Sequence, residues 1–146
     1  MKIRIMNIED YVQVHHLWMN TKGLGLTNID DSENGIRKYL NRNPSTCFVA
    51  EEGNNIVGVI LAGHDGRRGF IYHMAVDAKL QRQGIGKDLL NHAQHALRKE
   101  GIPKVALVAL IDNKVGNAFW EKEGFLERKD LTYRSFALQD IENVYT

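Results

Sequence analysis

Two glycines stand in a polar turn between an apolar run and a helix, the arrangement in this chain best suited to hold a ligand. The turn reads Gln81, Arg82, Gln83, Gly84, Ile85, Gly86. The residues after it have helical spacing of apolar side chains, at Ile85, Leu89, Leu90, Ala93, Ala96 and Leu97. The first N–H groups of a helix lack acceptors, and the positive end of the helix dipole lies there. The stretch therefore predicts a site for a phosphate group.

Other glycine loops fit the stretch less well. A Walker loop needs Ser or Thr after Gly-Lys, but Gly86 and Lys87 are followed by Asp88. A dinucleotide fingerprint needs a third glycine where Leu89 stands. Two interpretations stay open at this point: an ordinary strand-to-helix turn, and a nucleotide-binding protein that would prefer ATP to other phosphate ligands.

A second motif follows the next apolar run. It begins at Asn113, has the small residue Gly116 three positions on, and ends with Phe119-Trp120-Glu121-Lys122-Glu123-Gly124-Phe125. Together with a loop of the form Gln/Arg-x-x-Gly-x-Gly/Ala, this motif resembles the two hallmarks of the GCN5-related N-acetyltransferase (GNAT) family. The motifs occur in the family's order with one strand between them, and the resemblance covers nearly the whole chain.

The resemblance implies a single N-acetyltransferase domain over residues 1–146 that uses acetyl-CoA as co-substrate. In the family, the glycine loop holds the pyrophosphate and the asparagine binds the pantetheine arm. The cofactor-binding residues expected here are Met74, Ala75, Val76, Gln81, Arg82, Gln83, Gly84, Ile85, Gly86, Lys87, Asp88, Asn113 and Trp120.

One departure concerns the acid that protonates the departing thiolate. Many relatives carry a tyrosine where this chain has Trp120, and an indole N–H cannot give up its proton in that way. Trp120 is therefore expected to pack along the cofactor arm. Tyr133 is an alternative acid, and a thiol with a pKa of about 8.5 also leaves tolerably as an anion.

The base that accepts the amine proton is expected near the end of the apolar strand. His73 has a suitable intrinsic pKa and is the first candidate, followed by Tyr72, while His64, Asp65 and water are weaker ones. Because side chains alternate along a strand, His73 should lie on the face opposite Tyr72.

The predicted activity is acetyl transfer from acetyl-CoA to a primary amine by direct attack in a ternary complex. No nucleophile constellation for an acyl-enzyme is visible, and Cys47 stands in an apolar run. The acceptor is either a protein N-terminal or lysine amine or a small-molecule amine. The alternative is a non-catalytic acyl-CoA-binding sensor module.

Composition narrows the class of protein. The chain has 146 residues, a net charge of +1, a hydrophobic fraction of 43% and one cysteine, so we expect one cytoplasmic domain without disulfides. Neither a nucleic-acid partner nor a membrane partner is indicated, and the oligomeric state is left as monomer or homodimer.

His92 and His95 stand three apart on the helix, but no further ligand accompanies them, so no metal is expected.

The elements that must position these residues follow from periodicity and turn signals. We expect an α/β (α+β) fold with a mixed, mostly antiparallel central sheet of about seven strands flanked by four helices, the acyl-CoA N-acyltransferase fold. Helices are predicted from Asn7, from Asp31 or Ser32, over the stretch after Gly84, and from Asp112 or Asn113. The strands are predicted near residues 2–5, 46–52, 56–63, 70–76, 105–111, 125–128 and 131–138, the last two as a hairpin.

Overall fold

A computed structural model describes residues 1–144; Tyr145 and Thr146, the last two residues of the predicted domain, lie outside it. The strands are β1 (Lys2–Ile5), β2 (Leu26–Thr27), β3 (Phe48–Glu52), β4 (Asn55–His64), β5 (Gly69–Val76), β6 (Val105–Leu107) and β7 (Asn143–Val144). The helices are α1 (Tyr11–Met19), α2 (Glu33–Arg42), α3 (Ile85–Lys99) and α4 (Lys114–Lys122), with short 3-10 turns at Ile8–Asp10 and Ala78–Leu80.

The central sheet has five strands in the order β1-β3-β4-β5-β6. Its pairs are antiparallel except β5 with β6, which are parallel and joined through α3. A mixed, mostly antiparallel sheet with four helices confirms the predicted fold class. The predicted count of about seven strands in one sheet differs, since β2 and β7 form a separate two-stranded sheet.

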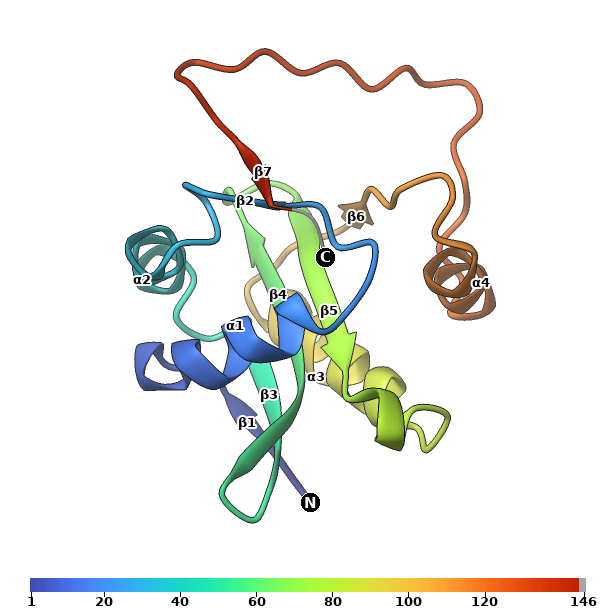
Figure 1. Cartoon of the computed structure of the whole chain (residues 1–146). Helices are drawn as coiled ribbons and strands as arrows, with labels where there is room; N and C mark the ends of the chain where they lie inside the picture. The colour runs from blue at the N-terminus through green and yellow to red at the C-terminus, as the bar shows by residue number, and fades with distance from the viewer. Residues whose placement is uncertain (145–146) are drawn as a thin grey trace.

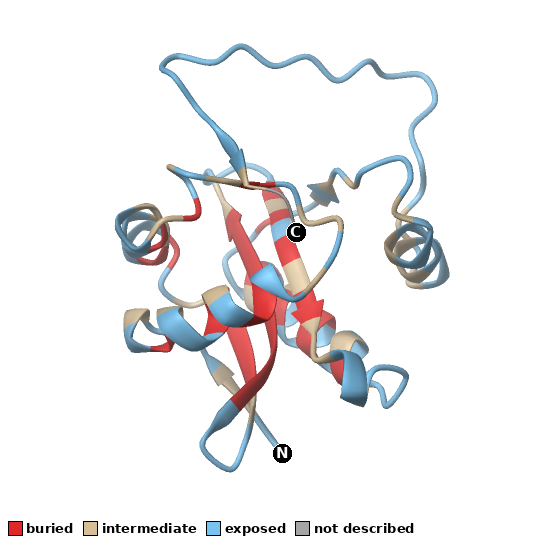
Figure 2. Ribbon diagram, viewed as in Figure 1, coloured by how far each residue is buried: buried red, intermediate tan, exposed pale blue. Residues whose placement is uncertain are grey.

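Helices cover both faces of the sheet and create two apolar clusters (Figure 1). The cluster under α1 and α2 contains Trp18 and Ile36, and the cluster under α3 contains Leu89 and Ala93. Figure 2 shows the buried residues concentrated in the strands between these helices. Strand β4 is buried along most of its length, which explains why its sequence is apolar on both faces.

Close approach of a helix to the sheet depends on a glycine in β4. A side chain on Gly58 would meet Leu89 at 3.0 Å and Ile85 at 3.2 Å. Because glycine leaves that space open, the first two turns of α3 lie directly on the strand. The loop before α3 is thereby held at a fixed place beside the end of β5.

The structure also identifies which residues begin the helices. Ser32, rather than Asp31, caps α2, because its hydroxyl accepts a hydrogen bond from the Gly35 N–H at 3.0 Å. Asn113 caps α4 in the same way, through the Gly116 N–H.

The predicted C-terminal hairpin is wrong. Residues 125–142 contain no strand, and β7 begins only at Asn143, where it pairs with β2. Figure 1 shows this segment arching from α4 to β7 away from the sheet, and Figure 2 shows it exposed. Its residues have strand-forming composition but find no strand to pair with, and an isolated hairpin is marginal in water. Lys129 and Asp130 still form the predicted turn.

The strand predicted over residues 105–111 is also too long. The structure ends β6 at Leu107, and Ile111 is 97% exposed. Strand β6 is an edge strand that pairs only with the first part of β5, so the apolar run loses its partner as the two strands separate. None of the helices within residues 1–144 has the length and apolar content needed to cross a lipid bilayer.

Candidate active site

A β-bulge in β5 lies at the centre of the candidate site. Leu61 of β4 pairs with His73, but the next residue, Ala62, pairs with Ile71, so Tyr72 has no partner across the ladder. An extra residue of this kind bends the strand and re-aims its side chains. The sequence contains no turn signal at this position that would have revealed the bulge.

The bulge places Tyr72 and His73 on the same face of the sheet. The Tyr72 ring lies 5.6 Å from Tyr39 of α2, and the His73 ring lies 5.1 Å from Trp18 of α1. Ile71 packs instead into the cluster under α3. The predicted alternation, with His73 opposite Tyr72, is therefore wrong at this point, because the extra residue shifts the side-chain pattern by one.

Beyond the bulge, one edge of β5 is left without a neighbouring strand. Pairing with β6 ends at Ile71, whereas β5 continues to Val76. The Asp77 N–H donates to Val57 of β4 at 2.8 Å, so by alternation the N–H groups of Met74 and Val76 point away from β4. These two N–H groups lie on the unpaired edge, where an extended ligand could accept their hydrogen bonds.

The glycine loop follows directly from this edge. Arg82 and Gly84 adopt left-handed backbone angles, with φ of 67° and 86°. Residues 81–84 are exposed, and the N–H groups of residues 83–87 have no acceptor within residues 1–144. A row of free N–H groups at the start of the long helix α3 is the arrangement that binds a phosphate.

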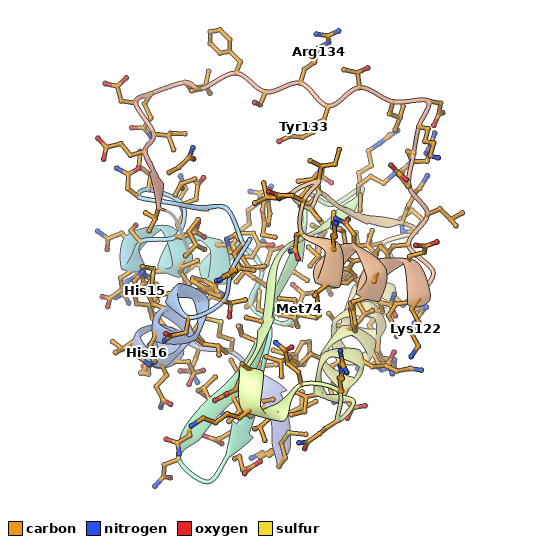
Figure 3. All side chains as sticks on the ribbon, turned by 45° about the vertical axis from the view of Figure 1, so that its right-hand side comes forward. His15, His16, Met74, Lys122, Tyr133 and Arg134 are labelled. Atoms are coloured by element: carbon orange, nitrogen blue, oxygen red, sulfur yellow. The ribbon has the colours of Figure 1, made fainter. Side chains whose placement is uncertain are left out.

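The second glycine allows close packing beside the loop. A side chain on Gly86 would meet Met74 at 3.4 Å and Phe119 of α4 at 3.5 Å. Gly86 therefore lies where β5, α3 and α4 come together, and its missing side chain keeps that space narrow but open. Figure 3 shows Met74 in the middle of the molecule between these elements.

Helix α4 contributes Trp120, and Asn113 is the cap of this helix. The Asn113 Nδ2 group has no acceptor within residues 1–144 and lies next to the loop between α1 and α2, 3.1 Å from where a Gly23 side chain would begin. Trp120 packs edge-on against Phe119 and Phe125, at ring distances of 4.9 and 5.2 Å. The amide thus has a free donor, while the indole belongs to an aromatic cluster.

His73 is buried next to the bulge and is paired with Asp31, which the sequence indicated only as a possible helix cap. The His73 Nε2 atom lies 2.8 Å from Asp31 Oδ1, and the two residues are 7% and 6% exposed. Asp31 Oδ2 also accepts the Thr27 N–H at 2.8 Å. With Nε2–H donated to Asp31, a neutral His73 keeps the lone pair on Nδ1, which has no partner among the described residues.

Two tyrosine hydroxyls lie nearer to solvent on the same side. Partial burial raises the pKa of Tyr72, and the nearby Asp30 and Tyr133 raise it further. Figure 3 shows Tyr133 on the C-terminal segment with its side chain turned inward, whereas Arg134 points away from the body. The structure thus brings Tyr133 toward Tyr72 even though its predicted strand is absent.

The remaining candidates lie elsewhere. Burial raises the pKa of the Cys47 thiol to about 12, so this group stays protonated near neutral pH. His64 ends β4 and Asp65 follows it in the turn, where their side chains accept backbone N–H groups. No group of three or more His, Cys, Asp or Glu side chains that could hold a metal is found in residues 1–144.

Comparisons with known proteins concern the family and the fold of the chain. Residues 11–125 match the model of the acetyltransferase (GNAT) family. The fold is similar to that of Ard1 from Thermoplasma volcanium (TM-score 0.73, 21% identity, 86% of this chain and 82% of that chain). It is also similar to the PaiA N-acetyltransferase from Thermoplasma acidophilum bound to coenzyme A (TM-score 0.72, 21% identity, 84% and 87%).

A third similar structure is an aminoglycoside acetyltransferase, meta-AAC0020, from an uncultured soil metagenomic sample, in complex with sisomicin. Its TM-score is 0.72 at 23% identity, with 94% of this chain and 96% of that chain covered. At this level of identity, the likeness shows a shared fold.

Proposed function

Since the chain belongs to the acetyltransferase (GNAT) family, we propose that it transfers an acetyl group from acetyl-CoA to a primary amine. One observation supports this above all others. The unpaired edge of β5, with the Met74 and Val76 N–H groups, leads directly to the free N–H groups of residues 83–87. An extended molecule with a diphosphate at one end satisfies both sets of donors.

The residues fit acetyl-CoA in three respects. The glycine loop and the start of α3 bind the diphosphate through backbone N–H groups, which Gly84 leaves sterically open. Asn113 Nδ2 binds the pantetheine arm from the side of α4. Trp120 supports that arm through its aromatic neighbours rather than acting as an acid.

The reaction proceeds by direct attack of the amine nitrogen on the thioester carbonyl. A C–N bond forms, the C–S bond breaks, and the electron pair leaves on the coenzyme A sulfur. The Met74 N–H stabilises the negative charge that develops on the carbonyl oxygen. We propose no acyl-enzyme on Cys47, because this thiol is buried, protonated and hydrogen-bonded to the Ala62 carbonyl at 3.1 Å, which makes it a poor nucleophile.

Before attack, the ammonium group must lose a proton, since an alkyl amine has a pKa of about 10.4. We assign this step to His73 Nδ1, because this buried ring nitrogen has no partner among the described residues. Asp31 fixes the orientation of the ring through its hydrogen bond with Nε2. The bulge supports this role, because it turns His73 toward the face that also carries Tyr72.

The departing thiolate takes its proton from a tyrosine hydroxyl or from water. We choose Tyr133 as the acid, because its side chain is turned inward and is 73% exposed to solvent. Tyr72 is the other candidate. The acceptor amine is either a protein N-terminal or lysine amine or a small-molecule amine, and it approaches on the face of the sheet that carries Tyr72 and α2.

An assay of thiol release from acetyl-CoA with a panel of amines and peptides tests the proposal. Thermal-shift measurements with acetyl-CoA and with ATP run alongside it. Turnover of an amine, with stabilisation by acetyl-CoA but not by ATP, is the expected result. Stabilisation by acetyl-CoA without turnover of any amine would instead favour the acyl-CoA sensor, a role that the burial of His73 makes the main alternative.

A further inference from the structure

A cavity of about 410 Å³ lies between the end of α2 and the start of β5. Its aromatic wall consists of Tyr39, Phe70 and Tyr72. The Tyr72 ring lies 4.7 Å from the Phe70 ring and 5.6 Å from the Tyr39 ring. Because Tyr72 belongs both to this wall and to the bulge, the cavity begins beside the proposed reaction centre. It extends away from the phosphate loop, toward Gly69 at the other end of β5.

The far end of the cavity is positively charged. Arg42 and Arg68 line it, and neither guanidinium has a carboxylate within 4.0 Å in residues 1–144. The charge of Asp65 is directed at its own turn, where one oxygen accepts the N–H groups of Arg67 and Arg68 at 2.8 Å each. His64, also in the lining, is hydrogen-bonded to Glu100 at 3.3 Å. Two arginines therefore remain available to a ligand.

Resting on the acetyl-transfer function, we propose that this cavity binds the body of the acceptor and that the acceptor carries an anionic group. Its amine lies at Tyr72, its apolar or flat body packs on the aromatic wall, and its carboxylate or similar group meets Arg42 and Arg68. Gly69 precedes Tyr72 by three strand positions, so the amine and the anion are about 10 Å apart. Polycationic acceptors are disfavoured, because two arginines would face them.

Three linear amines of similar length test the charge preference directly. The first is 8-aminooctanoate, whose amine and carboxylate are separated by the predicted distance. Octylamine lacks the second charge, and 1,8-diaminooctane reverses it. With saturating acetyl-CoA, kcat/KM for 8-aminooctanoate should exceed that for each of the others by about tenfold or more, since a charge-assisted hydrogen bond to arginine is gained.

Variants locate the effect. Arg42→Gln and Arg68→Gln should each raise KM for 8-aminooctanoate about tenfold, while KM for octylamine and for acetyl-CoA stays unchanged. Arg68→Lys should restore part of the affinity, because the charge is kept but the bidentate fork is lost. Arg134→Gln is the matched control, since this arginine points away from the body on the C-terminal segment and should behave as wild type.

Calorimetry on the coenzyme A-loaded protein adds a readout that does not depend on turnover. The product analogue N-acetyl-8-aminooctanoate should bind the wild type more tightly than N-octylacetamide does, and the two arginine variants should lose that difference. Equal binding of the two compounds, or equal use of all three amines, would overturn the charge preference while leaving acetyl transfer intact. Absence of amine turnover with selective binding retained would instead count against the proposed function alone.

Discussion

His73 of β5 and Asp31 at the start of α2 are joined by a buried hydrogen bond of 2.8 Å between Nε2 and Oδ1. The bond connects the strand that carries the proposed reaction centre to the loop that precedes α2. Asp31 binds the same loop a second time through the Thr27 N–H, and its own carbonyl accepts the Tyr11 hydroxyl at 2.6 Å. One residue therefore ties a loop, a helix and the central sheet together.

Removing the Asp31 carboxylate should destabilise the fold. Asp31→Ala leaves the His73 and Thr27 donors buried without an acceptor, at a cost of about 1–3 kcal/mol for each unsatisfied group. Asp31→Asn keeps one acceptor oxygen and should cost less. Urea unfolding at equilibrium measures both variants, and an equal, small loss of stability in the two would contradict the central role of this carboxylate.

The proton-acceptor role of His73 predicts a change in pH dependence. In His73→Gln, the side chain retains a donor for Asp31 but loses the ring nitrogen proposed to accept the proton, so kcat should fall and the acid limb of the kcat/KM profile should disappear. Tyr72→Phe should leave that limb in place. If His73→Gln kept the wild-type profile, water would be the better assignment for the base.

Coenzyme A affinity should depend sharply on Gly84. Gly84→Asp puts a negative charge beside the free N–H groups of the loop and should weaken coenzyme A binding by about 100-fold or more. Gly101→Asp is the matched control, because Gly101 has a similar left-handed φ of 77° and equally open surroundings at the far end of α3. Calorimetric titration compares the two. Unchanged affinity in Gly84→Asp would refute the phosphate site.

Acid should remove a stabilising ion pair near the N-terminus. Burial alone would raise the pKa of Asp10, but hydrogen bonds from Arg4 at 2.8 and 2.9 Å and from the Asn7 N–H outweigh it, and the pKa is lowered. The pair therefore stabilises the fold above the unfolded pKa of about 3.9, and this contribution is lost as pH falls through the lower folded value.

Arg4→Met should accordingly cost about 1–3 kcal/mol near pH 7, and the difference from wild type should shrink below about pH 4. Arg37→Met is the control, because its exposed ion pair with Glu33 should contribute no more than about 0.5 kcal/mol. Urea unfolding across this pH range reports both variants. A gap that stays constant with pH would mean that Arg4 acts through packing rather than charge.

Short stretches of sequence were enough to predict the glycine loop, a helix cap and the central strand. The glycine loop needs left-handed angles and free N–H groups at a helix start, and both are properties of a short stretch. The helix cap predicted at Asp112 or Asn113 is Asn113, and Gly124 follows the end of α4 with a positive φ as expected; both features are equally local. The apolar run of β4 likewise indicated a central strand, because only a strand covered on both faces carries such a pattern.

Features that depend on distant partners were missed. The bulge at Tyr72 exists only through the register between β4 and β5, so strict alternation put His73 on the wrong face relative to Tyr72. The C-terminal hairpin failed because a strand forms only where another strand offers its edge, and residues 125–142 meet none.

Taken alone, the sequence indicated the family, the order of the four helices and of strands β1 and β3 to β6, and the loop proposed to bind phosphate, because these depend on residue types at close spacing. Only the tertiary structure decided that Asp31 is hydrogen-bonded to His73, that Arg42 and Arg68 line a cavity with Tyr72, and that the Tyr133 side chain is turned inward. These residues are far apart along the chain, and they come together only when the burial of apolar side chains folds the helices onto the sheet.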